Sequence, residues 1–369
     1  WTLCAVLCVP PVRFAAMKVR ERTPDRAAPA WREREAILAR ARVWMPQAPD
    51  IASADLSRDP ADAPSATTGE LTCRYAPKAP TGTTAKFDCR LESGQILKVK
   101  YGWSREKQAE VAATRLLAVL GFGADRVSPL RAVRCIGCPP YPFEISRLTD
   151  QFLVQSFVDR AFIRAGVTPT FEWVAVERKL DGREVDADDF EGWDWRELAL
   201  VDAQAGGATR ADLDALRLIA VFLAHWDNKN TNQRLLCLGE DDDARERCAT
   251  PLLMLQDLGA TFGPTKVNYE RWAALPIWTD AATCTVSMAT LPYGGVLFPP
   301  TAISEAGRRL IGDKLRRLSE GQIVQLFTAA RFPDAATGET PARDVTPWVR
   351  AFQDKVRQIV ERPPCPSAP

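Results

Sequence analysis

The sequence lacks a long hydrophobic run, and it lacks an excess of charge of either sign. Its 369 residues include 48 lysines and arginines against 47 aspartates and glutamates, which gives a net charge of +1. Crossing a bilayer takes about 20 consecutive apolar residues, and binding nucleic acid or an anionic membrane usually takes a basic excess. We therefore expect no membrane span and no nucleic-acid partner. The 46% hydrophobic content predicts a large globular core.

Histidine is almost absent, whereas cysteine is abundant. His225 is the only histidine among ten cysteines. Three cysteine pairs enclose short segments, namely Cys73 with Cys89, Cys135 with Cys138, and Cys237 with Cys248. A structural zinc site needs a second cysteine pair or histidines beside such a motif. Disulfides in an oxidising compartment are thus the leading interpretation, with zinc and free thiols as alternatives, and Cys284 and Cys365 are left over.

The first residues form a short apolar stretch. Trp1 to Pro11 are largely apolar, and a small-residue site follows at Ala15-Ala16. Because the apolar region of a signal peptide has about 7–15 residues, we interpret residues 1–16 as a signal-peptide remnant of a secreted or periplasmic protein. The alternative is translated upstream sequence ahead of Met17, which predicts a cytoplasmic protein. The abundance of arginine and alanine is typical of a GC-rich bacterial genome.

Composition divides the rest of the chain into four parts. Residues 17–70 predict one surface helix followed by a flexible linker rich in Ala, Asp, Pro, Ser and Thr. Residues 71–180 show mainly strand patterns, and residues 181–362 show mainly helical ones. Residues 363–369 form a tail.

Two lysines share one face of a short apolar strand. The segments 86–91 and 95–101 predict a hairpin, and a period of two places Lys98 and Lys100 on the same face of its second strand. Either this is an edge strand with solvated lysines, or an anionic group meets one of them. Lys100, just before Gly102, is the first candidate and Lys98 the second.

The next helix, predicted over 105–120, carries an acid on its apolar face. Glu110 lies on that face, and Glu106 lies one turn earlier. An acid in this position lies at the edge of the apolar face or pairs with a group on a neighbouring strand. We expect Glu110 to pair with the strand lysine, with Glu106 as the competitor.

Polar residues gather directly after a buried helix predicted from Leu213. Asp227 and Asn232 follow this helix, and Asp257 of Asp-Leu-Gly follows a second apolar strand. Phosphoryl transfer needs one carboxylate that orients the attacking hydroxyl, and an amide and a second carboxylate for metal. These three residues supply that set. His225 is interpreted as a buried structural brace.

Two stretches carry a family resemblance. Ala109-Glu-Val-Ala-Ala and the following Leu120-Gly-Phe resemble the corresponding helix of the secretory-pathway kinases that phosphorylate casein and proteoglycan xylose, and are similar to that of type II phosphatidylinositol 4-kinases. His225-Trp-Asp227 with Asn232 resembles the His-Arg-Asp and Asn of protein kinases, with Trp in place of Arg. The resemblance implies an α+β, two-lobed protein-kinase-like fold. Its small β-rich N-lobe would hold one key helix, and its C-lobe would be mostly helical.

The same resemblance implies the ligands and the role of each residue. The cofactors would be ATP and Mg²⁺ or Mn²⁺. Lys100, or Lys98 as the second candidate, would contact the ATP phosphates and pair with Glu110. Gly82 and Thr83 would lie in the loop over the phosphates, unless that loop is an ordinary turn. The contacts with adenine would come from Val176 and Glu177. Asp227 would orient the acceptor, Lys229 would contact the transferred group, and Asn232 and Asp257 would hold metal.

The sequence therefore predicts an atypical kinase that transfers the γ-phosphoryl group of ATP to a hydroxyl acceptor. The acceptor could be a protein, a glycan or a small molecule. Two alternatives keep the fold: a pseudokinase or nucleotide-binding scaffold without turnover, and an enzyme that transfers AMP. Because the chain has no Ala-Pro-Glu motif after Phe262, a substrate platform of the usual eukaryotic kind is not expected.

Overall fold

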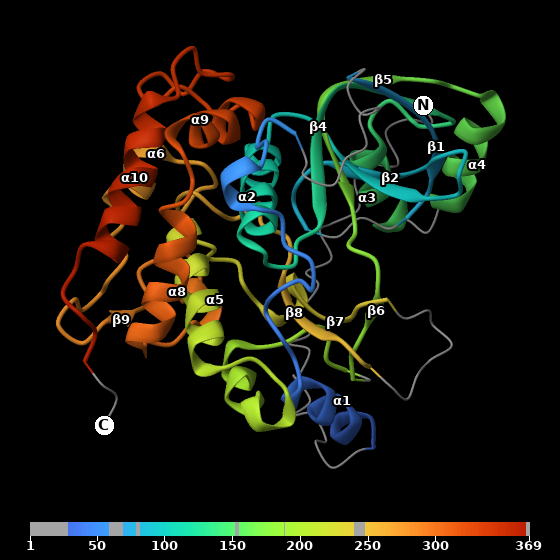
Figure 1. Ribbon diagram of the computed structural model, residues 1–369. Coiled ribbons are helices and arrows are strands. Elements are labelled where there is room, and N and C mark those ends of the chain that lie inside the picture. Colours follow the sequence, from blue (N-terminus) through green and yellow to red (C-terminus); the bar gives the residue numbers. More distant parts are fainter. Residues whose placement is uncertain are drawn as a thin grey trace, which may run out of the picture.

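The structure is a computed structural model that describes residues 29–58, 69–78, 82–151, 155–187, 189–239 and 248–366. The predicted signal remnant at 1–16 lies outside these residues, as do part of the linker and the end of the tail. The described chain forms two lobes, one built on a small barrel and one mostly helical (Figure 1). Within it, no helix has both the length and the apolar character that crossing a membrane requires.

The N-lobe is a closed five-stranded barrel. Its strands are β1 (Glu70–Ala76), β2 (Lys86–Arg90), β3 (Ile96–Lys100), β4 (Arg126–Ile136) and β5 (Thr170–Arg178). They are ordered β1-β2-β3-β5-β4, and a parallel pairing of β1 with β4 closes the barrel. Because β3 lies between β2 and β5, it is an interior strand. The alternative of an edge strand with solvated lysines is therefore wrong.

Alternation along β3 separates the barrel core from the functional face. Leu97 and Val99 point inward and are fully buried in the aromatic-rich barrel core. Lys98 and Lys100 consequently point outward. Helix α2 (Glu106–Leu120) follows β3 and packs beside the barrel, while α3 (Pro142–Gln151) and α4 (Gln155–Ala165) connect β4 to β5.

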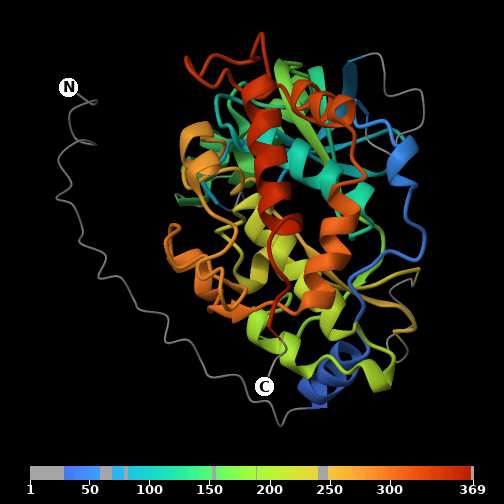
Figure 2. The same ribbon diagram turned by 60° about the vertical axis from the view of Figure 1, so that its left-hand side comes forward.

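The C-lobe is built around helix α5 (Arg210–Leu223). Thr209 and Asp212 form the predicted capping box at its start, and nearly all its later residues are buried. Around it lie α6 (Tyr269–Ala274), α7 (Gly294–Leu297), α8 (Glu305–Leu315), α9 (Glu320–Ala329) and α10 (Thr346–Val360). In Figure 2 the red helix α10 runs down the front of this lobe. The helices expected near 303–318, 319–331 and 346–361 are confirmed.

Short strands carry the loops of the C-lobe. β6 (Arg183–Glu184), β7 (Gln233–Cys237) and β8 (Pro251–Leu255) form an antiparallel sheet, and β9 (Thr285–Val286) pairs with β10 (Thr301–Ala302). Every residue of β7 and β8 is buried. The segments that follow α5 and β8 are thus held by a rigid, buried base.

The N-terminal extension packs on the C-lobe. Helix α1 (Pro29–Ala39) buries Arg34, whose guanidinium donates to Glu197 at 2.6 Å and to the Gly192 carbonyl at 2.6 Å. The helix lies at the surface with Arg32, Glu33 and Ala36 exposed, and its other face packs on the C-lobe. Ile51 and Leu56 are buried as well, and Gln322 of α9 donates to the Ile51 carbonyl at 2.7 Å. The first part of the expected linker is thus packed.

Eight cysteines form four disulfides. The bridges are Cys73–Cys89, Cys135–Cys138, Cys237–Cys248 and Cys284–Cys365. Three join the pairs expected from the sequence, and the fourth joins the two cysteines left over. No cysteine of the described chain remains as a free thiol or zinc ligand.

The Cys284–Cys365 bridge is expected to be the most stabilising of the four. It closes 81 residues, whereas Cys135–Cys138 closes only 3. Loop-closure entropy predicts a loss of about 4 kcal/mol when Cys284 and Cys365 are both replaced by Ser, against about 2 kcal/mol for Cys135 and Cys138. Urea unfolding of the two double variants measures this difference. Equal losses would contradict an entropic origin.

Candidate active site

Lys100 lies at the centre of a buried ionic cluster formed by three elements. Its ammonium nitrogen is 2.8 Å from Glu106 Oε1, contacts Glu110 Oε1, and is 3.3 Å from Asp257 Oδ1. The lysine is only 1% exposed. Strand β3, helix α2 and the segment after β8 therefore meet at one point, although Asp257 is 157 residues from Lys100.

Both candidate glutamates of α2 take part in this cluster. Glu106 and Glu110 are four residues apart, so they lie one above the other on the same helix face and both contact Lys100. The sequence treated them as competitors for one role. The structure instead gives Lys100 two helix partners.

Burial and the shared Lys100 ammonium group shift the pKa values of the three carboxylates that surround it. Burial alone would raise the pKa of Glu106, but the Lys100 and Lys266 ammonium groups hold it at about 2. Burial opposes ionisation of Asp257 too, and Lys100 again keeps its pKa below the usual range. The pKa of Glu110 is raised, because its burial and the nearby Asp257 outweigh Lys100. Negative charge is thus crowded around Lys100.

Glu106 also ties together two loops that the sequence did not connect. Its second oxygen accepts a hydrogen bond from Lys266 at 2.6 Å and contacts the Thr84 hydroxyl. Gly259 of Asp-Leu-Gly lies so close that a Cβ there would come within 1.9 Å of Glu106 Cγ. The glycine therefore permits α2 to approach Asp257. Neither Thr84 nor Lys266 was predicted, and no local pattern marks them.

Asp227 and Asn232 lie on the loop that leaves α5. Ala224 ends this helix in a left-handed conformation, and the Asn232 side-chain amide donates to the Asp227 carbonyl at 2.7 Å. The Asp227 carboxylate is 28% exposed and lies 3.7 Å from the Lys229 ammonium nitrogen. Asp227 therefore presents its carboxylate to solvent from a fixed backbone.

Backbone hydrogen bonds align this loop with the segment that holds Asp257. The Gln256 N–H donates to the Asn232 carbonyl at 3.0 Å, and the Trp226 N–H donates to the Ala260 carbonyl at 3.2 Å. Asp257 adopts a φ of 50°, a left-handed conformation that is uncommon for residues with a side chain and often marks functional sites. These hydrogen bonds thus fix the loop that carries Asp227 and Asn232 relative to Asp257, which belongs to the ionic cluster around Lys100.

The described chain has a two-lobed α+β fold, which is consistent with the predicted protein-kinase-like architecture. A five-stranded barrel with one helix bearing the paired glutamates faces a helical lobe with two loops bearing the aspartates, and this is the predicted α+β architecture.

Comparisons with known proteins add little to this assignment. No family model matches the chain, and no curated protein is similar to it. Among solved structures, the Helicobacter pylori proinflammatory kinase CtkA aligns with 79% of this chain and 96% of its own length. The identity is 10% and the TM-score is 0.39.

The remaining residues predicted for the site lie outside the ionic cluster around Lys100. Lys98 pairs with Glu177 at 2.6 Å, so it stays the second candidate for the lysine that contacts the phosphates. Val176 and Glu177 lie inside β5, between β3 and β4, and their contact with adenine stays a prediction. In the loop before β2, Gly82 and Thr83 are exposed, and Gly82 has a φ of 73° that favours glycine.

His225 is buried completely, as expected of a brace. Burial lowers its pKa to about 4, so the ring is neutral at pH 7. Its backbone N–H donates to the Ala220 carbonyl at 3.0 Å, directly before Trp226 and Asp227. Both ring nitrogens are buried without a hydrogen-bond partner among the described residues, so the ring fills space beneath the loop and does not brace it by a side-chain hydrogen bond.

Titration of this single histidine predicts a pH-dependent stability. The unfolded pKa is about 6.5, above the folded value, so below pH 6.5 the unfolded chain binds more protons than the folded chain. From pH 6.5 to 5.0 the free energy of unfolding of the wild type should fall by about 1.6 kcal/mol relative to that of His225→Phe. Urea unfolding across this range measures it. An equal fall in both proteins would show that another group is responsible.

Proposed function

We propose that the protein is an ATP-dependent phosphotransferase that moves the γ-phosphoryl group to a hydroxyl acceptor. The observation that carries the proposal is the position of Lys100, which contacts Glu110 and lies 3.3 Å from Asp257. A strand lysine paired with a helix glutamate positions nucleotide phosphates in kinases, and the nearby carboxylate serves metal.

Each side chain then has a role that its surroundings support. Lys100 would bind the phosphates, and Glu110 would hold the lysine in position. Asp227, exposed on a fixed backbone, would orient the acceptor hydroxyl and accept its proton. Lys229, 3.7 Å from that carboxylate, would contact the transferred group. Gly82 and Thr83 would cover the phosphates.

The donors present fit a hard divalent cation. Mg²⁺ and Mn²⁺ prefer carboxylate and amide oxygens. The Asp257 side chain is 39% exposed, and Asn232 uses its amide nitrogen for the Asp227 carbonyl, which leaves the amide oxygen for metal. Asp257 and Asn232 would hold Mg²⁺ or Mn²⁺, which would neutralise charge on the phosphates.

The disulfides support a location outside the reducing cytosol. Such bridges persist in secreted and periplasmic proteins, and four are present. We therefore place the reaction in a secreted or periplasmic setting. The acceptor class (protein, glycan or small molecule) is left to experiment.

Product mass distinguishes this proposal from its alternatives. The protein is incubated with ATP and Mn²⁺ beside a panel containing a hydroxyl-bearing protein, a glycoside and a small alcohol. A mass gain of about 80 Da indicates phosphorylation, and a gain of about 329 Da indicates AMP transfer. No product and no ADP, with ATP still raising the melting temperature, would favour the scaffold and overturn the proposal.

A further inference from the structure

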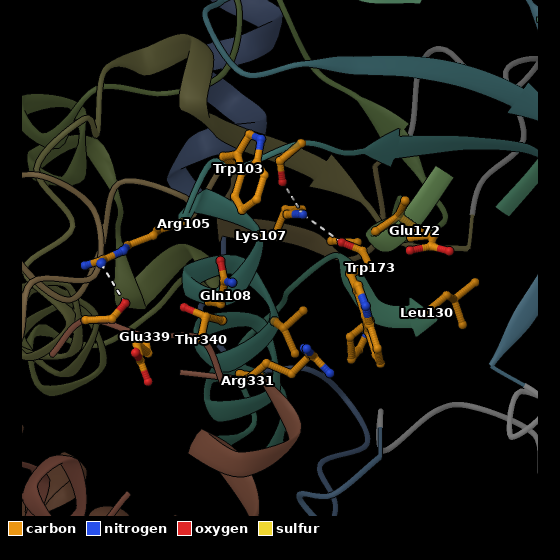
Figure 3. A pocket seen from close by; sticks show the side chains of 17 residues that line it. Trp103, Arg105, Lys107, Gln108, Leu130, Glu172, Trp173, Arg331, Glu339 and Thr340 are labelled. Carbon is orange, nitrogen blue, oxygen red and sulfur yellow. Dashed lines mark hydrogen bonds between the residues drawn. The ribbon is translucent and has the colours of Figure 1, made fainter. Parts of the chain in front are cut away.

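A cavity lies beside helix α2, apart from the ionic cluster around Lys100. It has a volume of about 640 Å³ and is enclosed by α2, by β4 and β5, and by the end of α9 with the loop after it (Figure 3). Lys100 and Asp257 do not line it. Its volume lies within the range of small-molecule sites, about 300–1,000 Å³.

The cavity combines aromatic surface with positive charge. Trp173 lines one wall, and the fully exposed Trp103 stands at its edge. Lys107 donates to the Gly102 and Trp173 carbonyls at 2.6 and 2.7 Å, and Arg331 lies over the Trp173 ring, 3.5 Å from its centroid. Figure 3 shows the Lys107 ammonium between Trp103 and Trp173, and the Arg331 guanidinium against the Trp173 ring.

These two cations lack acidic partners within the residues described. No carboxylate comes within ion-pair distance of Lys107 or Arg331. Burial lowers the pKa of Lys107 to about 8, and the nearby Arg331 adds to this effect. Glu172 and Glu339 also line the cavity, but neither pairs with these cations. Both cations are only partly buried, and a bound anion would stabilise such partly desolvated positive charge.

Backbone strain coincides with the same pair of residues. Trp173 has a φ of 50° and Arg331 a φ of 56°, a left-handed conformation that costs about 1–2 kcal/mol for a residue with a side chain. Trp173 belongs to the N-lobe strand β5, whereas Arg331 follows α9 of the C-lobe. Two strained residues from opposite lobes thus meet in one stacking contact, and strain of this kind collects at ligand sites.

We propose that this cavity binds a small aromatic anion, with Lys107 and Arg331 facing its charged group and Trp103 and Trp173 its ring. A carboxylate or sulfonate attached to one or two rings matches the volume, the charge and the aromatic lining. Stacking on the tryptophans supplies apolar contact. The two cations favour a negatively charged ligand over a neutral one.

The cavity is linked to the ionic cluster through α2. Lys107 and Val111 line it, about 100° around the helix axis from Glu106 and Glu110. Arg105, also in the lining, donates to the Val267 carbonyl at 3.2 Å, next to the Lys266 that holds Glu106. An occupant that moves the first turn of α2 would therefore change nucleotide affinity, and this second step rests on the proposed function.

Binding is tested with two fluorescent probes that differ only in charge. The full chain is titrated with 8-anilinonaphthalene-1-sulfonate and with N-phenyl-1-naphthylamine, which has the same rings without the sulfonate. The sulfonate is expected to bind at least about tenfold more tightly. Lys107→Met and Arg331→Met should each weaken sulfonate binding about tenfold, and Arg316→Met, a surface control, should not.

A cavity-filling variant and ATP complete the test. Gln108→Trp, on the α2 wall of the cavity, should abolish sulfonate binding, while saturating ATP should alter its affinity without displacing it. Equal binding of the two probes, unchanged binding in Lys107→Met and Arg331→Met, or competitive displacement by ATP would each overturn the proposal. Probe binding needs no turnover, so it is judged even if phosphoryl transfer is not found.

Discussion

Asp227→Asn should lower the rate of phosphoryl transfer by about a thousandfold, because an amide cannot accept the proton of the acceptor hydroxyl. The fold should be kept. The Asp227 carboxylate is partly exposed, and its ion pair with Lys229 is long at 3.7 Å. We expect the free energy of unfolding to change by less than about 0.5 kcal/mol.

The rate is measured as ADP formed from ATP and Mn²⁺ in the presence of the acceptor found by product mass. Asp280→Asn is the matched control, since Asp280 is an exposed loop carboxylate of the C-lobe that hydrogen-bonds Thr283. Its rate should equal that of the wild type. A rate for Asp227→Asn within threefold of the wild type would remove Asp227 from the mechanism.

Lys100→Met should destabilise the protein by about 3–5 kcal/mol, because it leaves buried carboxylates without their cation. Glu106 and Glu110 are 7% and 2% exposed, so water cannot replace the ammonium. The pKa of Glu106, now about 2, should rise toward its ordinary value. Urea unfolding at pH 7 gives the loss of free energy.

Lys98→Met is the matched control for this prediction. Lys98 lies two residues away on the same face of β3, but its side chain is 28% exposed and has a single partner, Glu177. It should lose less than half as much stability as Lys100→Met. Adding Glu106→Gln to Lys100→Met should restore part of the loss, since one buried charge is then removed. Equal losses for both lysines would contradict the central place of Lys100.

The sequence was most informative where a local period determines which way a side chain points. The alternation in β3 placed Lys98 and Lys100 on one face, and the spacing in α2 placed Glu106 and Glu110 on another. These two patterns, with the polar residues after α5 and β8, were enough to predict the two-lobed fold. They did not decide between the glutamates, because both lie on the face that meets the lysine.

Such local patterns could not predict contacts between segments that lie far apart in the sequence. Thr84 and Lys266 reach Glu106 only because a loop of each lobe folds over the start of α2, and no period or motif marks either residue. Arg34 lies in the segment that was predicted to form a surface helix from its charged residues and helix formers. It is buried instead, since Glu197 lies 163 positions further along the chain and meets it.

The contacts of Glu106 suggest how the candidate active site is organised. One carboxylate joins Lys100 of β3, the Thr84 loop and the Lys266 segment after Asp-Leu-Gly. These are the three parts of the fold that would surround the nucleotide phosphates. We infer that Glu106 sets their relative position, while Glu110 is the dedicated partner of Lys100.

The central claim is that Lys100 and Asp257 belong to one site for ATP and metal. Calorimetric titration with ATP, with Mn²⁺ present and then absent, tests it most directly in the wild type and in Asp257→Asn. The account predicts that Mn²⁺ tightens ATP binding at least about tenfold in the wild type and has little effect in the variant. Binding that is equally tight in both proteins with and without Mn²⁺, or no ATP binding by the wild type, would contradict it.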